Sequence, residues 1–354
     1  MKSIFEKFLF SLTVLLGVYI ILFFLFQVLP INSAQSMIGQ SSNKATEEAI
    51  AKEFHLDQPP MVRLLISLNE ISPLSYFSEA EKAVFAWDSN SYEGIKLFSI
   101  SQNGLYLKYP YFGKSFQNQE RVTTLLAQRF LSTLVLALCS IIFATIIGVL
   151  LGILAAVKKN TWIDQACLAF SAMGISAPSF FVAILIALLF GYYLSEWTGL
   201  SFKGSLIEMD DYGNRIYVWK NLILPVIALG LRPVAILTQI TRNSMLDVLG
   251  EDYIRTAVAK GLSPRVVFFK HALLNALNPV ITSVSGWFGS LLAGAYFIEV
   301  IFDFKGLGNL TVNALMKFDI PVVMGASLYV AFTFVVISFV VDFLYLMIDP
   351  RMRK

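Results

Sequence analysis

Several apolar runs in this chain are long enough to cross a lipid bilayer, and this feature limits its fold more than any other. A membrane-spanning helix needs about 20 mostly apolar residues. Of the 354 residues, 56% are hydrophobic and only 14% are charged, whereas a soluble domain carries about 25% charged residues. The sequence therefore predicts a membrane protein. Its net charge of +3 comes without a basic stripe, which argues against a nucleic-acid partner.

Six runs reach the required length, so we predict an all-α membrane protein with six transmembrane helices. They cover residues 8–29, 130–157, 165–194, 222–240, 280–300 and 322–348. The third run is interrupted at Pro178 and the fourth contains Pro225. A proline in a membrane helix frees backbone groups that must be satisfied within protein or a cavity. These two prolines are therefore either kinks beside a transport pathway or simple bends.

The first run has an alternative interpretation as a cleaved signal peptide. Lys2 and Lys7 supply a positive start, and small residues follow the run. The apolar core is nevertheless longer than the 7–15 residues that are usual in a signal peptide. We expect a retained transmembrane helix.

The distribution of lysine and arginine predicts the orientation, because basic residues concentrate in cytoplasmic loops. If the N-terminus lies inside, twelve basic residues fall in the inner segments and five in the two short outer loops. The inner ones are Lys2, Lys7, Lys158, Lys159, Arg242, Arg255, Lys260, Arg265, Lys270, Arg351, Arg353 and Lys354; the outer ones are Lys203, Arg215, Lys220, Lys305 and Lys317. Both termini are therefore expected in the cytoplasm of a multi-pass protein of the cell membrane.

The runs divide the chain into four parts. Residues 1–30 hold the N-terminus and first helix, and residues 31–121 form a long extracellular cap segment. Residues 122–348 hold the other five helices, and residues 349–354 form a cytoplasmic tail. The start of the cap reads as a helix, a stop at Pro59-Pro60, and a second helix.

The polar segment 243–279 separates the fourth and fifth runs and lies on the cytoplasmic side. Residues 243–260 are typical of a helix, and Gly261 tolerates the left-handed conformation that ends helices. Ser263 can cap a second helix, with Pro264 at its first position, where no amide donor is needed. The sequence thus predicts two helices joined by a tight turn over residues 261–264.

Apolar residues recur at steps of three and four in the second of these helices. Val266, Phe269, Leu273 and Leu277 mark one apolar face, opposite Arg265 and, in part, His271. Two interpretations remain open from the residues alone. The segment is either a solvated loop that is basic because it lies near anionic lipid, or a docking element for a cytoplasmic partner.

Two stretches of this segment, "YIRTAVAKGL" and "HALLNALNPV", resemble the EAA loop of type I ABC importer permeases. Ala257, Gly261 and Leu273 keep the general pattern of that loop, and the departures from it are those of the dipeptide/oligopeptide (nickel) importer family. The resemblance extends to "EFHLDQPP", "YFGKS", "SAPSFFVAILIALLF", "LPVIALGL" and "YLMIDPRMRK". The outer segment between "LDQPP" and "YFGKS" is longer than this family leads us to expect.

The resemblance implies a type I ABC importer permease fold with an extracellular insertion after the first helix. It implies a non-catalytic subunit that forms half of the transmembrane pathway for peptide uptake, with nickel or metal chelates and glutathione as alternative cargoes. The implied partners are a second homologous permease, two cytoplasmic ATP-binding subunits, an extracellular substrate-binding protein and membrane lipid. ATP and Mg would bind in the ATPase subunits, and this chain would bind no cofactor.

The resemblance also implies that the loop over residues 252–280 couples the chain to its ATPases. The residues that it assigns to this coupling loop are Arg255, Thr256, Ala257, Lys260, Gly261, Leu262, Ser263, Pro264, His271, Leu273 and Asn275.

Three other functions find little support. "YFGKS" ends like a nucleotide-binding P-loop, but Lys108 stands where that motif needs its first glycine. An ion-coupled secondary transporter needs ionisable groups near the bilayer midplane. The runs offer Arg232, Glu299 and Asp342, which we interpret as helix-end or inter-helix contacts.

An intramembrane hydrolase would need a nucleophile beside a base. The serines of "SVSGWFGS" lie in the fifth run, but His55 and His271 fall outside the runs and on opposite sides of the membrane. Cys139 and Cys167 lie inside apolar runs and are interpreted as small buried hydrophobic residues. The sequence therefore favours no catalytic or metal site in this chain.

Overall fold

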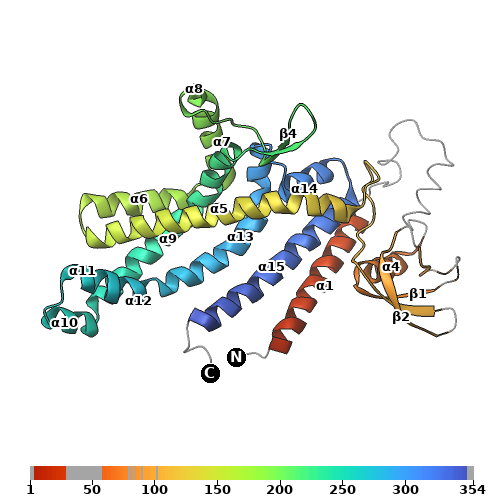
Figure 1. Cartoon of the computed structure of the whole chain (residues 1–354), viewed down its shortest axis with the longest axis horizontal. Coiled ribbons are helices and arrows are strands. Elements are labelled where there is room, and N and C mark those ends of the chain that lie inside the picture. Colours follow the sequence, from red (N-terminus) through yellow and green to blue (C-terminus); the bar gives the residue numbers. More distant parts are fainter. Residues whose placement is uncertain are drawn as a thin grey trace. The chain divides into compact units, whose positions relative to one another are not determined.

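The chain divides into two compact units. The computed structural model describes residues 4–28 and 58–348, apart from residues 79, 81–82, 84, 89–90 and 101–102, and Figure 1 follows them along the sequence. Of the described residues, those up to Arg129 together with Leu310–Val335 form the first unit, and Phe130–Asn309 together with residues 336–348 form the second. Each unit is described by itself below.

Long apolar helices dominate both units. Four candidate membrane spans lie in the described residues: Glu6–Phe26 within α1 (Ile4–Val28), α5 (Val122–Val157), α9 (Lys220–Gly250), and Ile320–Val340 within α15 (Ile320–Ile348). Two further spans are obtained only if helices are joined across a bend. One joins α6 (Trp162–Ser176) to Ser179–Tyr193 at 108°, and the other joins two parts of α13 (Asn278–Ile301) at 53°. The prediction of a helical membrane protein is confirmed, with four to six spans in the described part.

The third predicted run is not one straight helix. Ala177 and Pro178 have extended backbone, with ψ of 133° and 130°, because a proline disfavours helical geometry in the residue before it. The chain then continues as α7 (Ser179–Leu188), the π-helical turn η2 (Leu189–Tyr193) and α8 (Ser195–Thr198). The interruption predicted at Pro178 is therefore confirmed, and it is a sharp turn.

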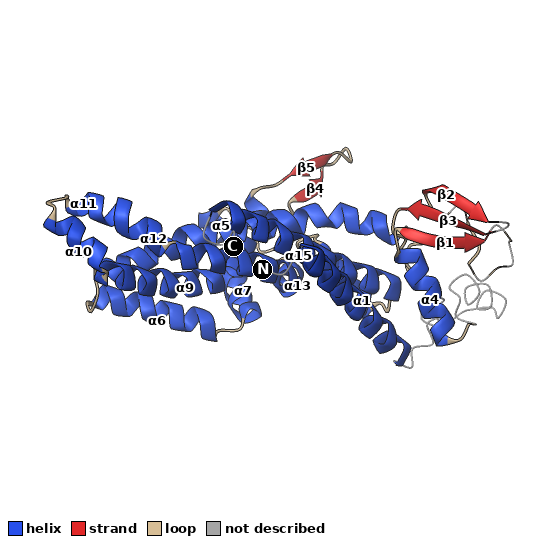
Figure 2. Cartoon of the chain, turned by 90° about the horizontal axis from the view of Figure 1, so that it is seen from below, coloured by secondary structure: helices blue, strands red, loops and turns tan. Residues whose placement is uncertain are grey.

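The first unit contains a sheet, so the all-α prediction is wrong for this part of the chain. Strands β1 (Leu74–Ser78), β2 (Gly94–Ile100) and β3 (Asn103–Lys108) form an antiparallel sheet in the order β1-β3-β2 (Figure 2). Burial alternates along β3, as a strand with one covered face requires. The helix predicted after Pro59-Pro60 is confirmed as α4 (Pro60–Ile71). The helix predicted before it lies outside the described residues.

A buried lysine sits among aromatic rings beside this sheet. The Lys108 ammonium donates to the Glu70 carbonyl and lies 5.3 Å from the centre of the Tyr92 ring and 5.8 Å from that of Phe77. The Tyr92 hydroxyl donates to Glu70 Oε1 at 2.8 Å. Burial lowers the pKa of Lys108 to about 8, and burial raises the pKa of the Glu70 carboxyl.

Asp319 anchors the start of α15 within the same unit. Its carboxylate accepts hydrogen bonds from the Ser115 hydroxyl and from the Phe116 N–H, the latter at 3.0 Å. Ser115 therefore takes part in a structural contact rather than in a P-loop. A cluster of apolar residues from α1, α4 and α15 completes this unit: Tyr19, Phe23, Leu64 and Leu328.

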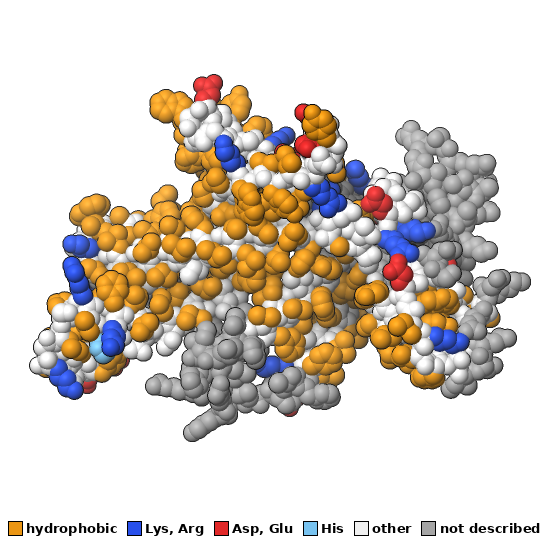
Figure 3. All heavy atoms as spheres, viewed as in Figure 1, with side chains coloured by type: hydrophobic (Ala, Val, Ile, Leu, Met, Phe, Trp, Pro, Cys, Tyr) orange, Lys and Arg blue, Asp and Glu red, His pale blue; other side chains and the backbone are white. Residues whose placement is uncertain are grey.

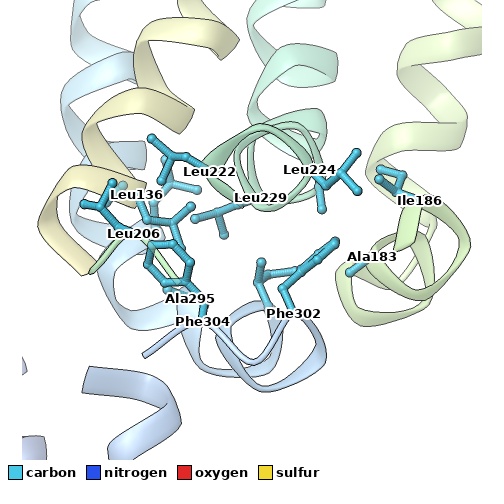
Figure 4. Close-up of a cluster of buried hydrophobic side chains, with 14 of the residues drawn as sticks. Leu136, Ala183, Ile186, Leu206, Leu222, Leu224, Leu229, Ala295, Phe302 and Phe304 are labelled. Atoms are coloured by element: carbon cyan, nitrogen blue, oxygen red, sulfur yellow. The ribbon is translucent and has the colours of Figure 1, made fainter. Parts of the chain in front are cut away.

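The core of the second unit gathers around the N-terminal half of α9 (Figure 4). Leu222, Leu224 and Leu229 of α9 share this cluster with Ala183 and Ile186 of α7, and Leu224 lies on the side of α9 that faces α7. Leu136 of α5, Leu206, Ala295 of α13, Phe302 and Phe304 complete the cluster. A hairpin of β4 (Ile207–Met209) and β5 (Arg215–Tyr217) follows Leu206, and α14 (Leu307–Met316) follows Phe304.

Two glycines of α5 allow that helix to approach α9 closely. A Cβ atom on Gly148 would lie 2.7 Å from Leu237 Cβ, and one on Gly152 would lie 2.5 Å from Thr241 Cβ. Both distances are shorter than carbon atoms tolerate, so only glycine fits at this crossing, as is common where membrane helices pack. The contact fixes one face of α9 against α5.

Beyond α9, the second unit continues as a run of short helices. They are α10 (Asp252–Ala259), α11 (Pro264–Val266), the π-helical segment η3 (Val267–Leu273) and α12 (Leu274–Ala276), which leads into α13. In Figure 3, hydrophobic side chains cover the face over α5 and α6, whereas lysine and arginine atoms gather at the end that carries α10 and α11.

Candidate functional site

The candidate site is the helical hairpin that follows α9. Residues 243–260 do not form the single helix that we predicted, because α9 ends at Gly250 and α10 begins at Asp252. Between them Glu251 is extended, with φ of −71° and ψ of 148°. The exposed Gly250 has no side chain that would favour continuing the helix. The hairpin is therefore a separate element after a break.

The turn after α10 has the geometry that the sequence predicted for it. Gly261 has φ of +77°. The Gly261 N–H donates to the Val258 carbonyl at 2.9 Å and the Leu262 N–H donates to the Ala257 carbonyl at 3.3 Å. This pair of bonds is a Schellman motif, which satisfies the last carbonyls of a helix and needs a left-handed residue at its centre. Gly261 is therefore fixed by backbone geometry.

Ser263 and Pro264 start the second arm. Pro264 occupies the first position of α11, as predicted, and Ser263 is extended with ψ of 146°. The Ser263 side chain makes no capping hydrogen bond. Instead its carbonyl accepts the Val267 N–H at 3.1 Å. The prediction of a serine cap is correct for the backbone position and wrong for the hydroxyl.

The apolar face predicted for the second arm is correct only in its later half. Leu273 and Leu277 are half-buried and pack against buried residues, whereas Val266 and Phe269 are 38% and 61% exposed. The buried residues are Val267, Ala272 and Ala276. Val267 and Ala272 are five residues apart, and both are buried because η3 is π-helical. The wider turn of a π-helix brings residues five apart onto the same face, whereas our prediction assumed steps of three and four.

Buried residues of the hairpin join it to the end of α9. Ile254 and Ala257 of α10 pack with Val267, Ala272 and Ala276 of the second arm, and with Met245 of α9. The side-chain amide of Asn275 donates to the Tyr253 hydroxyl at 3.1 Å and to the His271 carbonyl at 2.8 Å. Both arms and α9 thus share one small core. Tyr253, which we did not predict as a site residue, is one of the groups that hold the arms together.

The solvent-exposed surface of the hairpin carries both apolar and basic side chains. Val258 is 59% exposed and Leu262 is 39% exposed, on either side of Gly261, around which a side chain would meet open space. Arg255, Lys260, Arg265 and Lys270 are also exposed. The Thr256 hydroxyl donates to the Asp252 carbonyl at 2.9 Å. We call Val258, Leu262, Val266 and Phe269 the apolar knob.

The predicted loop residues therefore fall into two groups. The exposed ones are Arg255, Thr256, Lys260, Gly261, Leu262, Ser263, Pro264 and Asn275. Ala257 is buried, and His271 and Leu273 are half-buried, so these three support the hairpin from within.

Comparison with known proteins assigns the chain to a protein family. Residues 148–354 match the family described as "Binding-protein-dependent transport system inner membrane component". This match covers more than half of the 354 residues.

The chain belongs to this family.

Named relatives agree with that placement. The di/tripeptide transport system permease protein DppB of Pseudomonas aeruginosa is 38% identical over 256 residues, covering 68% of this chain and 76% of the relative. A putative peptide transport system permease protein of Brucella abortus is 33% identical over 344 residues, covering 97% and 96%. The inner membrane component described here thus resembles permeases along nearly its whole length.

A solved structure shares the fold. The MetNI methionine ABC transporter in inward-facing conformations matches with a TM-score of 0.51, at 16% sequence identity. The match covers 64% of this chain and 97% of that chain. At this identity the likeness concerns the fold alone.

Elsewhere in this inner membrane component, the two predicted prolines differ in effect. Pro178 lies at the sharp turn between α6 and α7. Pro225 is buried inside α9, which continues past it, and a second proline in α9, Pro233, was not singled out from the sequence. Of the two predicted prolines, Pro178 alone breaks a helix in the described part of the chain.

A buried ion pair joins α6 to α9. Arg242 Nε and Nη2 donate to the Asp164 carboxylate at 2.6 Å and 2.8 Å. The same carboxylate accepts the Asn160 N–H at 2.9 Å. Asp164 is only 2% exposed. Nothing in the local sequence pairs residues 78 positions apart, so sequence reasoning missed this contact.

The three ionisable groups of the spans meet different surroundings. Glu299 is fully buried and accepts the Thr133 hydroxyl at 2.7 Å and the Asn309 N–H at 2.9 Å, which agrees with the predicted inter-helix contact. Arg232 is exposed. The side chain of Asp342 lies outside the described residues.

Proposed function

We propose that this chain is the permease subunit of an ATP-driven ABC importer and forms half of the transmembrane pathway for the uptake of peptides. Support for the cargo comes from the relatives, whose names specify dipeptide, di/tripeptide or peptide transport. Support for the mechanism comes from the hairpin after α9. ATP and Mg belong to the partner subunits, and this chain is non-catalytic.

The apolar knob is the observation that carries the proposal. Large apolar side chains exposed together on a polar loop mark a surface that binds another protein. Here Val258, Leu262 and Val266 are exposed within five residues of the turn at Gly261, and the exposed Phe269 follows in η3. Basic side chains are exposed on the same hairpin. We infer that this knob seats in a groove of a cytoplasmic ATP-binding subunit, with the basic residues at the rim.

The same hairpin is suited to transmit movement. Its buried residues pack against Met245 of α9, and η3 and α12 lead directly into α13. When the ATP-binding subunits close, a push on the knob would therefore move two membrane helices as one rigid body. The transmembrane pathway would alternate between inward-open and outward-open in response.

The proposed arrangement in the membrane follows from charge. We place both termini and the hairpin in the cytoplasm, because lysine and arginine concentrate in those segments. Counting each bent pair as one span gives six spans in the described residues. Residues 31–121 then form an extracellular insertion, and residues 122–348 form the transporter domain.

We propose that this chain has four kinds of partner in the full importer. They are a second homologous permease, two cytoplasmic ATP-binding subunits, an extracellular substrate-binding protein and the lipid of the cell membrane. Pro178 and Pro225 are proposed to lie beside the pathway between the two permeases.

Other cargoes keep the same architecture. Permeases with this loop also serve nickel or metal chelates and glutathione, and the loop does not distinguish among them. An ion-coupled secondary transporter is a weaker alternative, because the buried Glu299 is engaged with Thr133 and Asn309.

Co-purification with the ATP-binding subunits tests the coupling role. The wild-type chain should capture them from a co-expressing cell, and Phe269→Asp should lose most of them while staying in the membrane. Asp252→Asn is the matched control, since its exposed pair with Arg255 is worth little. Equal capture by Phe269→Asp and wild type would refute docking through the knob.

A further inference from the structure

Arg232 lies near the middle of a helix whose composition is that of a membrane span. It is the thirteenth residue of α9 (Lys220–Gly250), about 18 Å from one end and about 27 Å from the other at 1.5 Å per residue. A charged side chain at this depth is expensive in lipid and marks a polar pathway or a protein contact. The position of this arginine therefore calls for a polar neighbour.

The other faces of α9 are already covered. Gly148 of α5 meets Leu237, and Gly174 of α6 meets Ala235. Val280 of α13 packs in one cluster with Val234 and Leu237. Toward the outer end, Leu224 and Ala228 share the main core with α7. The remaining face contains Arg232, which follows Ala228 by four residues.

Polar residues recur along this face, with the half-buried Ile236 between the first two of them. Gln239, Asn243 and Asp247 follow Arg232 at steps of seven, four and four residues, which places all four on one side of the helix. Arg232, Asn243 and Asp247 are exposed and Gln239 is half-buried. We call these four residues the polar stripe. Within the predicted span of residues 222–240, Arg232 and Gln239 are unsuited to lipid and need water or a polar partner. Asn243 and Asp247 continue the stripe into the segment that we place in the cytoplasm.

The carbonyl of Leu229 is a further polar group near Arg232. It lacks its helical hydrogen bond because Pro233, four residues later, has no N–H to donate. A carbonyl without its helical donor must be satisfied by protein or by water in a cavity. Within the described residues, the Arg232 guanidinium has no hydrogen-bond or ion-pair partner. Its donors are therefore available to a ligand.

We propose that the polar stripe lines the aqueous transport pathway and that Arg232 binds the α-carboxylate of the transported peptide. This inference rests on the proposed peptide-uptake function. A guanidinium presents a planar pair of N–H groups that matches a carboxylate, and a peptide with a free C-terminus carries one such group whatever its side chains. A site of this kind therefore serves a transporter that accepts many sequences.

The test uses the assembled importer in inside-out membrane vesicles without the binding protein, so that selection by that protein does not enter. Gln239→Cys places a thiol two turns from Arg232 on the same face, in a background where Cys139 and Cys167 are replaced by alanine. A water-soluble methanethiosulfonate reagent should label this thiol. Ile146→Cys, on the exposed apolar side of α5, should remain unlabelled.

Trialanine and its C-terminal amide then serve as a matched pair of probes. Trialanine should protect the thiol at a concentration about tenfold lower than the amide does, as expected for a charge-assisted hydrogen bond. Arg232→Gln should abolish that difference and Arg232→Lys should largely keep it. Each comparison is a ratio within one variant, so the charge of the reagent does not affect it.

Three results would overturn the inference in distinguishable ways. A thiol at position 239 that is as unreactive as the one at 146 would show that the stripe is dry, as in a contact with the second permease. Labelling with equal protection by acid and amide would exclude the carboxylate site. Labelling without any protection, together with no peptide uptake by the wild type, would refute the peptide cargo while leaving the stripe in the pathway.

Discussion

The Asp164 carboxylate accepts hydrogen bonds from both Nε and Nη2 of Arg242, at 2.6 Å and 2.8 Å, and so joins the first turn of α6 to the C-terminal part of α9. Removing one partner of a fully buried ion pair costs about 3–5 kcal/mol, and since the Arg242 side chain left behind keeps some contact with solvent, we expect a loss at or below the lower end of that range. Asp164→Ala should therefore lower the thermal unfolding temperature of the detergent-solubilised chain. Replacing both residues, as Asp164→Ala with Arg242→Met, should recover much of the loss. Unchanged unfolding of the single variant would contradict this account of the pair.

The crossing of α5 and α9 depends on the absence of a side chain at Gly148. A Cβ atom at this position would already lie 2.7 Å from Leu237 Cβ, and Gly148→Val adds two methyl groups beyond it. Overpacking of this kind costs roughly 1–3 kcal/mol, so thermal unfolding should shift down. Gly286→Ala is the control, since a Cβ there meets nothing within 4 Å. A similar shift in both variants would show that the crossing is not responsible.

The left-handed turn at Gly261 should be needed for coupling rather than for insertion. Gly261→Val forces a β-branched residue to φ of +77°, which costs about 1–2 kcal/mol and should displace the knob. We expect normal membrane insertion but strongly reduced transport-coupled ATP hydrolysis in the reconstituted importer. Gly250→Ala, which meets open space and has no positive φ, should retain coupling. Full coupling in Gly261→Val would remove the turn from the mechanism.

The sheet in the first unit should gain stability as the pH rises above about 8. The folded pKa of Lys108 is about 8, below its ordinary value of 10.5. Between these values the unfolded chain binds a proton that the folded chain does not, so rising pH favours folding. Hydrogen exchange of β1–β3 in the full chain, corrected for the intrinsic rate, should slow across this range.

The pH range of that experiment needs an upper limit. The pKa of Tyr92 is raised by burial, and a tyrosine with a raised pKa makes folding less favourable above about pH 10. The measurement should therefore stop near pH 9.5. Lys108→Met should show no such slowing. The same pH dependence in that variant would assign the effect to another group.

Local sequence was sufficient where one residue determines the backbone. Gly261 and Pro264 were predicted at their turn and helix start because their φ angles and missing groups leave few alternatives. The long apolar runs were likewise predictable, because lipid imposes both length and composition on a span.

Other features depend on contacts that the sequence does not show. The π-helical register of η3 moved Phe269 to the surface, and a step of five residues has no signature in a pattern of threes and fours. The pair Asp164 and Arg242 is separated by 78 positions. The polar stripe, which includes Arg232, is recognised only from the helices that cover the other faces of α9, and the sequence does not show which helices these are. The sheet of the first unit was missed because its short strands lie in a segment that the apolar runs do not constrain.

ATP-dependent uptake of a labelled tripeptide into proteoliposomes tests the central proposal most directly. The vesicles would contain this chain with its second permease and two ATP-binding subunits, and the loaded binding protein would be added outside. The account predicts uptake that requires ATP and every subunit, and that is lost with Phe269→Asp. Accumulation by this chain alone, driven by an ion gradient without ATP, would contradict it.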